Sequence, residues 1–198
     1  MRTAAYPGSF DPLTVAHLAV AEAAVEQLAV DRVDLVISID PLGKDASHQV
    51  RVGDRLAVLG AAADARPWIG VTTTEHRLIA DIAAGYDAVI MGADKWAQVL
   101  DPAWYAGSTA ARDRALATLP AVGVAPRAAD AAPAAPVLVP ANLRVVELDL
   151  HPSHRAVSAT SVRAGRREWM AAEAAAFADR TGAWIDPDRY TSWVRVNP

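Results

Sequence analysis

The chain has 198 residues, of which 53% are hydrophobic and 21% charged. This composition predicts one well-buried domain and excludes a disordered or collagen-like chain. A net charge of −4 argues against a broad basic surface for duplex nucleic acid or an anionic membrane, so any phosphate site must be local. The absence of cysteine excludes disulfides, thiolate zinc sites and cysteine nucleophiles.

The first residues lack the apolar region of a signal peptide. No uncharged apolar run approaches the roughly eighteen residues that a membrane helix needs. We therefore expect a cytoplasmic protein with no nucleic-acid and no membrane partner. The sequence does not determine the oligomeric state and is compatible with a homo-oligomer.

Short β-rich runs alternate with helical segments along the chain, which is typical of βαβ units. Strands are expected at residues 3–6, 33–39, 69–73, 88–91, 121–125 and 143–150. Helices are expected at residues 15–29, 53–65, 75–84, 110–118 and 161–180. The pattern predicts an α/β fold with a Rossmann-like, open, mainly parallel sheet flanked by helices, and a C-terminal helical segment.

We interpret residues 1–198 as a single domain with three parts. Residues 1–126 form the core, and residues 141–198 carry the last strand and the C-terminal helical part. Between them, residues 127–140 (RAADAAPAAPVLVP) contain three prolines among alanines. This stretch is too rich in proline for a helix and too poor in large side chains for a core, so we expect a surface loop.

The first predicted strand leads into a turn, residues 7–12 (PGSFDP), and then into a helix that begins near Thr14 and His17. The N-terminus of a helix favours anions, by about 0.3–1 kcal/mol per charge. Thr14 and His17 are three residues apart and therefore share a face of the first helical turn. On spacing alone, ordinary turn and cap chemistry remains the more common explanation.

This stretch resembles the signature of the nucleotidylyltransferase superfamily: glycine, Ser or Thr, Phe-Asp-Pro, then His/Thr-x-Gly-His. Residues 14–17 read TVAH, so Ala16 replaces a family glycine, and its methyl narrows the approach of a ligand to the backbone. A second family element, Ile-Ser-Ser-Thr-x-Ile-Arg, is similar to residues 157–163 (VSATSVR). Alone, that second run would be better explained as a plain helix cap; together, the two motifs favour a phosphate-binding function.

The resemblance implies transfer of a nucleotidyl group, in which an acceptor phosphate displaces pyrophosphate from a nucleoside triphosphate. Such catalysis is positioning and charge stabilisation, and it needs no protein nucleophile. The resemblance implies catalytic roles for His17, Thr14 and Lys44, the lysine belonging to a Pro-x-x-Lys-like segment after the second strand. It also implies ATP contacts from Gly8, Ser9, Phe10, Ser158, Thr160, Ser161 and Arg163.

The phosphate site predicted at the second motif depends on a few side chains. Ser158, Thr160 and Ser161 are expected to cap the last long helix, with Arg163 in its first turn. No metal site is predicted in the protein, because His151 and His154 have ligand spacing but no evident third ligand. Mg²⁺ is expected to be carried with ATP, largely hydrated.

The acceptor is a small phosphorylated molecule in this interpretation. Gly92-Ala93-Asp94 is similar to the Gly-x-Asp of bacterial nicotinate mononucleotide adenylyltransferases, and Trp104-Tyr105 to their Trp-Tyr pair. The resemblance implies that Asp94, Trp104 and Tyr105 bind the acceptor, with the aromatic pair on a pyridine ring. Stacking of this kind contributes about 0.5–2 kcal/mol. Core packing is the alternative explanation of these aromatics.

Adenylyl transfer to nicotinate or nicotinamide mononucleotide is therefore the function that the sequence favours. A phosphopantetheine adenylyltransferase, or another cytidylyl- or adenylyltransferase, is the alternative, because Tyr6-Pro7-Gly8 and Thr14 resemble that family. A third hypothesis is a nucleotide-binding protein without turnover, motivated by Ala16 and by a C-terminus that departs from the family pattern.

Overall fold

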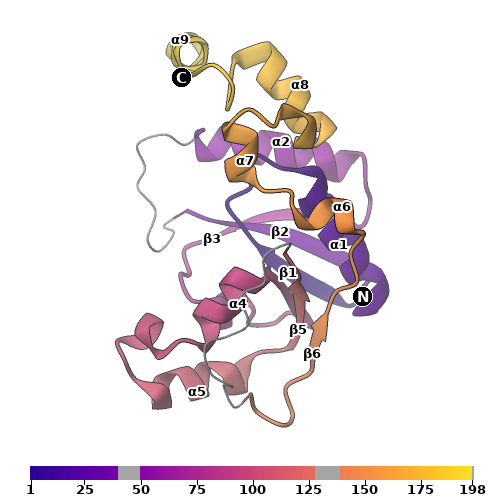
Figure 1. Cartoon of the computed structure of the whole chain (residues 1–198), viewed down its shortest axis with the longest axis vertical. Helices are drawn as coiled ribbons and strands as arrows, with labels where there is room; N and C mark the ends of the chain where they lie inside the picture. Colours follow the sequence, from indigo (N-terminus) through magenta and orange to yellow (C-terminus); the bar gives the residue numbers. More distant parts are fainter. Residues whose placement is uncertain (40–49, 128–138, 198) are drawn as a thin grey trace.

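A computed structural model describes residues 1–39, 50–127 and 139–197 (Figure 1). Its strands form one six-stranded parallel sheet in the order β3-β2-β1-β4-β5-β6, which confirms the predicted Rossmann-like α/β fold. The strands are β1 (Thr3–Pro7), β2 (Arg32–Ser38), β3 (Ile69–Thr74), β4 (Ala88–Gly92), β5 (Ala121–Ala125) and β6 (Val145–Glu147). The order reverses between β1 and β4, where open sheets of this kind bind ligands at the carboxyl ends of the strands.

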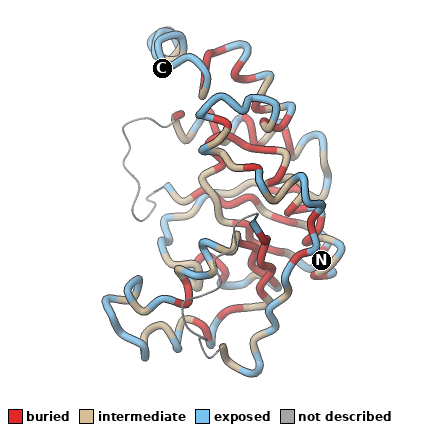
Figure 2. Tube along the Cα trace, viewed as in Figure 1, coloured by how far each residue is buried: buried red, intermediate tan, exposed pale blue. Residues whose placement is uncertain are grey.

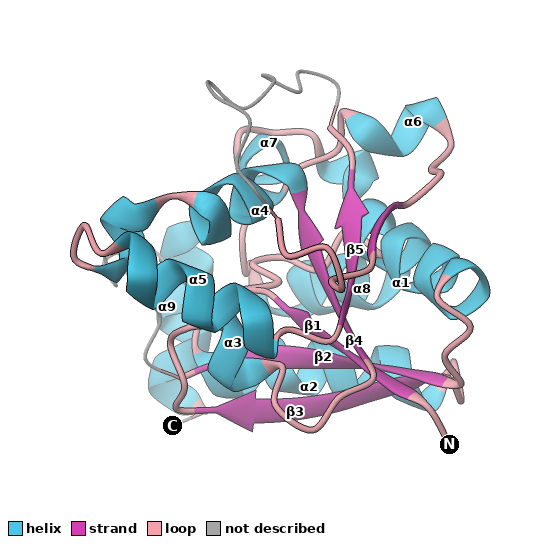
Figure 3. Cartoon of the chain, turned by 90° about the horizontal axis from the view of Figure 1, so that it is seen from below, coloured by secondary structure: helices cyan, strands magenta, loops and turns pink. Residues whose placement is uncertain are grey.

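Helices cover both faces of the sheet (Figure 3). They are α1 (Val15–Gln27), α2 (Val52–Asp64), α3 (Ile79–Ile82), α4 (Ala93–Leu100), α5 (Thr109–Thr118), α6 (Pro152–Arg155), α7 (Ala159–Arg163), α8 (Ala172–Thr181) and α9 (Pro187–Val196), with 3₁₀ turns η2 (Pro102–Tyr105) and η3 (Arg167–Trp169). Alternate residues of β1 face opposite layers, as a strand requires. Ala4 and Tyr6 join the apolar cluster of α1, α2 and α8, whereas Ala5 joins that of α3, α4 and α5.

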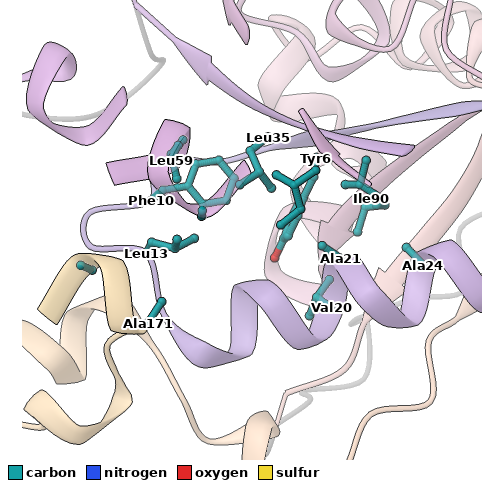
Figure 4. Close-up of a cluster of buried hydrophobic side chains, with 14 of the residues drawn as sticks. Tyr6, Phe10, Leu13, Val20, Ala21, Ala24, Leu35, Leu59, Ile90 and Ala171 are labelled. Atoms are coloured by element: carbon teal, nitrogen blue, oxygen red, sulfur yellow. The ribbon is translucent and has the colours of Figure 1, made fainter. Parts of the chain in front are cut away.

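The buried residues follow the central strands (Figure 2). Val89, Ile90 and Met91 of β4 are consecutive and all buried, because a parallel strand with helices on both faces exposes neither. The core extends into the turn after β1. There Phe10 and Leu13 pack among Leu35, Leu59 and other apolar side chains (Figure 4). The first motif is therefore anchored by its own buried side chains.

Two predicted elements are shorter than expected. The helix predicted at residues 75–84 is only α3, because side-chain bonds hold the preceding segment: the His76 amide donates to Thr74 Oγ1 (3.1 Å), and Ser38 Oγ donates to the His76 carbonyl (3.1 Å). The strand predicted at residues 143–150 is only β6. Beyond β6 the backbone of Asp149 pairs with the Gln27 side chain, which donates to the Asp149 carbonyl (3.1 Å) and accepts from the Asp149 amide (2.8 Å).

The long helix predicted at residues 161–180 is also wrong. It is divided into α7, η3 and α8, with Gly165 in a left-handed conformation (φ 111°) after α7. The connecting chain is drawn toward the first motif, since the Ala171 amide donates to the Leu13 carbonyl (3.1 Å) and Met170 forms a bridge with Thr14. The helices α4, α6 and α9 were not predicted. None of the described helices has the length and apolar character needed to cross a bilayer.

Candidate active site

The turn after β1 brings a glycine against an aromatic ring. A Cβ at Gly8 would lie 2.8 Å from Phe10 Cζ, so only glycine fits there without a shift. Phe10 is 2% exposed, and its ring meets the rings of Tyr6 (centroids 5.6 Å apart) and His17 (5.1 Å) edge to face. Phe10 thus lines neither of the two cavities described below. It supports His17 from the core instead of occupying the predicted position against ATP.

Thr14 and His17 form a capping box at the start of α1. Thr14 Oγ1 accepts from the His17 amide (3.3 Å), and the Thr14 amide donates to His17 Nδ1 (3.1 Å). The Thr14 hydroxyl also lies 2.9 Å from Nδ1. Because Nδ1 accepts, we assign the proton of the neutral imidazole to Nε2, which makes that edge of the ring a hydrogen-bond donor. These contacts bring the Thr14 and His17 side chains together at the start of α1, as the sequence predicts.

The larger of two adjoining cavities lies at the carboxyl ends of β1 and β4 and has a volume of about 640 Å³. It collects most of the predicted catalytic and ATP-binding residues, from segments far apart in the sequence. Those that line it are Gly8, Ser9, Thr14, His17, Ser158, Thr160 and Arg163. The predicted Lys44 lies outside the described residues, as does most of the predicted loop at residues 127–140.

The second motif is capped as predicted, but on a short helix. Ser158 Oγ accepts from the Ser161 amide (3.1 Å) and donates to Ser161 Oγ (2.9 Å), so Ser161 serves the cap and does not line the cavity. Since α7 has only five residues, its dipole is weaker than that of the long helix expected here. Anion recognition at this motif then depends mainly on Arg163 and Thr160, whose side chains are hydrogen-bonded (3.4 Å).

A buried carboxylate fixes Arg163. Asp11 is 3% exposed, accepts from Trp184 Nε1 (2.6 Å), and its Oδ2 lies 3.7 Å from Arg163 Nη1. Arg163 also donates to the Asp11 carbonyl. Trp184 belongs to the C-terminal region that departs from the family pattern, and sequence reasoning did not find it. An indole N–H that bonds to a distant residue is visible in a structure but produces no spacing pattern in the sequence.

The smaller cavity has a volume of about 160 Å³ and contains the predicted aromatic pair, Trp104 and Tyr105. Burial raises the pKa of Tyr105, whose hydroxyl donates to the Val99 carbonyl (3.1 Å). Asp94, predicted to bind the acceptor, instead lines the larger cavity, where its Oδ2 lies 3.0 Å from Arg127 Nε. The two cavities share one wall, which consists of Pro7, Gly8, Ser9, Lys95 and Gln98.

A buried arginine lies behind this wall. Arg55 Nη1 donates to the Ser9 carbonyl (2.8 Å) and Nε to the Val50 carbonyl (2.9 Å), and burial lowers the pKa of its guanidinium. Arg55 and Arg77 line the smaller cavity. Sequence reasoning did not propose Arg77, Lys95 or Gln98. The last two follow Gly-x-Asp at one-turn spacing, which a helical interpretation of residues 93–100 would have revealed.

The two cavities are lined by more cations than carboxylates, in a chain with net negative charge. The cationic side chains are Arg55, Arg77, Lys95, Arg127, Arg155 and Arg163, against Asp11 and Asp94. Both carboxylates lie beside an arginine. Within residues 1–39, 50–127 and 139–197, no group of three His, Asp or Glu side chains is placed to hold a metal ion. The excess of cationic side chains suits an anionic ligand.

The sequence matches the profile of the cytidylyltransferase-like family over residues 5–165. The chain belongs to this family. Among curated relatives of this cytidylyltransferase-like chain are the probable nicotinate-nucleotide adenylyltransferases of Bordetella avium, 40% identical over 68 residues, and Trichormus variabilis, 38% identical over 72 residues. The matches cover 34% and 36% of this chain, and 34% and 33% of those relatives. The chain therefore spans about a third of the length of the curated relatives it matches.

A solved structure shares the fold of this cytidylyltransferase-like chain. It is the nicotinic acid mononucleotide adenylyltransferase of Plasmodium falciparum complexed with NaAD, with a TM-score of 0.63 and 10% sequence identity. The match covers 92% of this chain and 97% of that one. At this identity the similarity concerns the fold alone.

Proposed function

We propose that the protein transfers the adenylyl group of ATP to nicotinate or nicotinamide mononucleotide, giving the dinucleotide and pyrophosphate. The observation that carries the proposal is the junction of the two cavities at Gly8 and Ser9. One cavity is large, polar and cationic, as a triphosphate requires; the other holds Trp104 and Tyr105, as a pyridine ring requires. The names of the curated relatives and of the structural neighbour agree with this substrate pair.

The reaction needs two phosphates to meet in line. A phosphate oxygen of the acceptor forms a bond to the α-phosphorus, the bond from that phosphorus to the bridging oxygen breaks, and pyrophosphate leaves with the electron pair. In our assignment His17 donates from Nε2 to an α-phosphate oxygen. One such contact to developing charge is worth about 2.7–4 kcal/mol in the transition state. Phe10 and Thr14 keep the ring in place.

In the same scheme Arg163 and Thr160 bind the departing pyrophosphate, and the first amide groups of α1 face the triphosphate. Mg²⁺ enters as part of the MgATP substrate, where it neutralises triphosphate charge. The residues present fit such a metal, since the carboxylates of Asp11 and Asp94 are placed beside arginines and leave the ion to phosphate and water.

Pyrophosphate release tests the proposal. The assay pairs ATP with nicotinate mononucleotide, nicotinamide mononucleotide, phosphopantetheine and simple phospho-alcohols, with CTP as the alternative donor. We expect release from ATP with one of the two pyridine mononucleotides. Release only with phosphopantetheine, or only with CTP, favours the alternative transferases. ATP binding without release for any acceptor contradicts the proposal and favours a nucleotide-binding protein without turnover.

A further inference from the structure

We propose that Lys95 is a catalytic residue of this transfer, with its ammonium placed between the acceptor phosphate and the α-phosphate of ATP. The inference rests on the proposed function and adds a cation at its reaction centre. Of the Lys and Arg side chains in the described ranges, Lys95 is the one that lines both cavities. Arg55 and Arg77 line only the smaller cavity, and Arg127, Arg155 and Arg163 line only the larger one.

The helix α4 explains this position. It starts directly after Gly92, at the carboxyl end of β4, so its first turn projects over the place where the strand order reverses. Lys95 and Gln98 are three residues apart and share a face of the helix, and both line the two cavities. Asp94 lies on a different side of the first turn and meets Arg127 (3.0 Å). The Asp94 carboxylate, although adjacent to Lys95 in the sequence, is thereby directed toward Arg127.

Two contacts hold the Lys95 ammonium. Its Nζ donates to Gln98 Oε1 (2.7 Å) and lies 5.8 Å from the centroid of the Trp104 ring, within the range of a cation–π interaction. Neither contact neutralises its charge. An ammonium has three N–H donors, so two remain for phosphate oxygens after the bond to Gln98. The contact with Trp104 also links the cation to the cavity that receives the acceptor.

The chemistry requires a cation at this point. Two anionic phosphates must approach within bonding distance, and their mutual repulsion opposes that approach. A lysine is a compact point charge that can contact an oxygen of each phosphate at once. Charge builds on the oxygens of the transferred group in the transition state, where a fixed cation acts most strongly. Lys95 therefore acts on kcat more than on the binding of ATP.

Kinetics of Lys95 variants test the assignment. We expect Lys95→Gln to lower kcat at least thirtyfold while the KM for ATP stays within about threefold, because His17 and Arg163 still hold the triphosphate. Lys95→Arg keeps the charge and should retain more than a tenth of wild-type kcat. The matched control is Arg114→Gln on the exposed face of α5, with kcat unchanged. A Lys95→Gln kcat within threefold of wild type overturns the proposal.

The pH profile gives a readout that a structural role would not move. Partial burial lowers the pKa of Lys95 below its ordinary value of 10.5. The charged and titratable side chains that share a cavity with it are Arg55, Arg77 and Tyr105 in the smaller one, and Tyr6, Asp11, His17, Asp94, Arg127, His154, Arg155 and Arg163 in the larger one. Because the protonated form is the active one, kcat should fall as pH rises through this lowered pKa. In Lys95→Arg that fall should move to higher pH. An alkaline limb identical in both proteins contradicts the assignment.

Amine labelling separates this inference from the proposed function, because it requires no turnover. Lys44 and Lys95 are the only lysines in the chain, so mass spectrometry after brief acetylation reads each one directly. We expect Mg²⁺ with a non-hydrolysable ATP analogue and nicotinate mononucleotide to slow the labelling of Lys95 at least fivefold. Unchanged labelling despite bound analogue overturns the position given to Lys95. A wild-type protein that releases no pyrophosphate overturns the proposed function; active wild type with equally active Lys95→Gln overturns only the present inference.

Discussion

The two cavities are built in different ways. Around the larger one, Phe10, Asp11 and Thr14 are between 1% and 3% exposed, and the polar groups are held by caps and buried pairs. Around the smaller one, Trp104 is 42% exposed and belongs to a single 3₁₀ turn. The walls of the larger cavity are thus fixed by buried groups, whereas in the smaller cavity the exposed Trp104 lies on a surface turn and closes a pocket that also contains buried residues such as Val36, Arg55 and Val99. In the proposed function, a substitution at Trp104 should therefore change acceptor preference with little effect on the fold.

The comparison predicts the largest effect at His17. We expect His17→Ala to lower kcat about a hundredfold or more while ATP still binds, because the imidazole acts on transition-state charge. His17 also caps α1. His17→Gln therefore provides the decisive variant, since glutamine at this position of a capping box preserves the cap and removes the imidazole.

Turnover is measured by pyrophosphate release, ATP binding by calorimetry, and folding by thermal unfolding. His76→Ala, at an exposed histidine, is the matched control and should keep wild-type kcat. An unchanged kcat in His17→Gln would show that His17 is structural, and the contrast between the two cavities would lose its chemical meaning.

Trp104 should give a smaller effect of a different kind. We expect Trp104→Ala to raise the KM for the acceptor about tenfold, from the loss of ring stacking, and to leave the KM for ATP within twofold. Trp104→Phe should raise the KM for the acceptor above the wild-type value but by less than Trp104→Ala. The same Trp→Phe change at Trp169, which lines neither cavity, is the control. Equal shifts in both KM values would place Trp104 outside the acceptor site.

The sequence predicted the parts of this molecule that local patterns determine. Strand periodicity and turn residues predicted the sheet, and the first motif predicted the pairing of Thr14 with His17. Phe10 was identified as a site residue, but its burial behind His17 depends on the three-dimensional path of the turn. A motif states which residues occur together, without stating which of them face the ligand.

The missed features depend on contacts between distant segments. Apolar, alanine-rich spacing predicted one long helix at residues 161–180, whereas the hydrogen bond from the Ala171 amide to Leu13 interrupts it. Asp94 and Lys95 are adjacent in sequence, and their side chains point in different directions only because α4 begins at Ala93. Trp184 reaches Asp11 across 173 positions of the chain. Pattern and propensity carry no information about such pairs.

The smallest expected effect tests whether the larger cavity depends on this remote support. Trp184→Phe keeps an aromatic ring beside Phe177 but removes the N–H that donates to the buried Asp11 carboxylate (2.6 Å). Loss of a hydrogen bond to a buried charged group costs about 1.5–3 kcal/mol, so the free energy of unfolding should fall by that amount. For a domain of this size the melting temperature should decrease by about 3–10 °C.

The same change should reach the nucleotide through Arg163. Asp11 meets both Trp184 and Arg163, so a carboxylate released from the indole no longer fixes the guanidinium, and the KM for ATP should rise about fivefold with kcat nearly unchanged. Trp193→Phe is the control, because its ring also contacts Phe177 but faces Arg51 instead of Asp11. If both variants lose stability yet share the wild-type KM for ATP, the buried network supports only the fold. A higher KM for ATP in Trp184→Phe alone would show that the C-terminal region helps to shape the larger cavity, whereas no described residue of that region lines the smaller one.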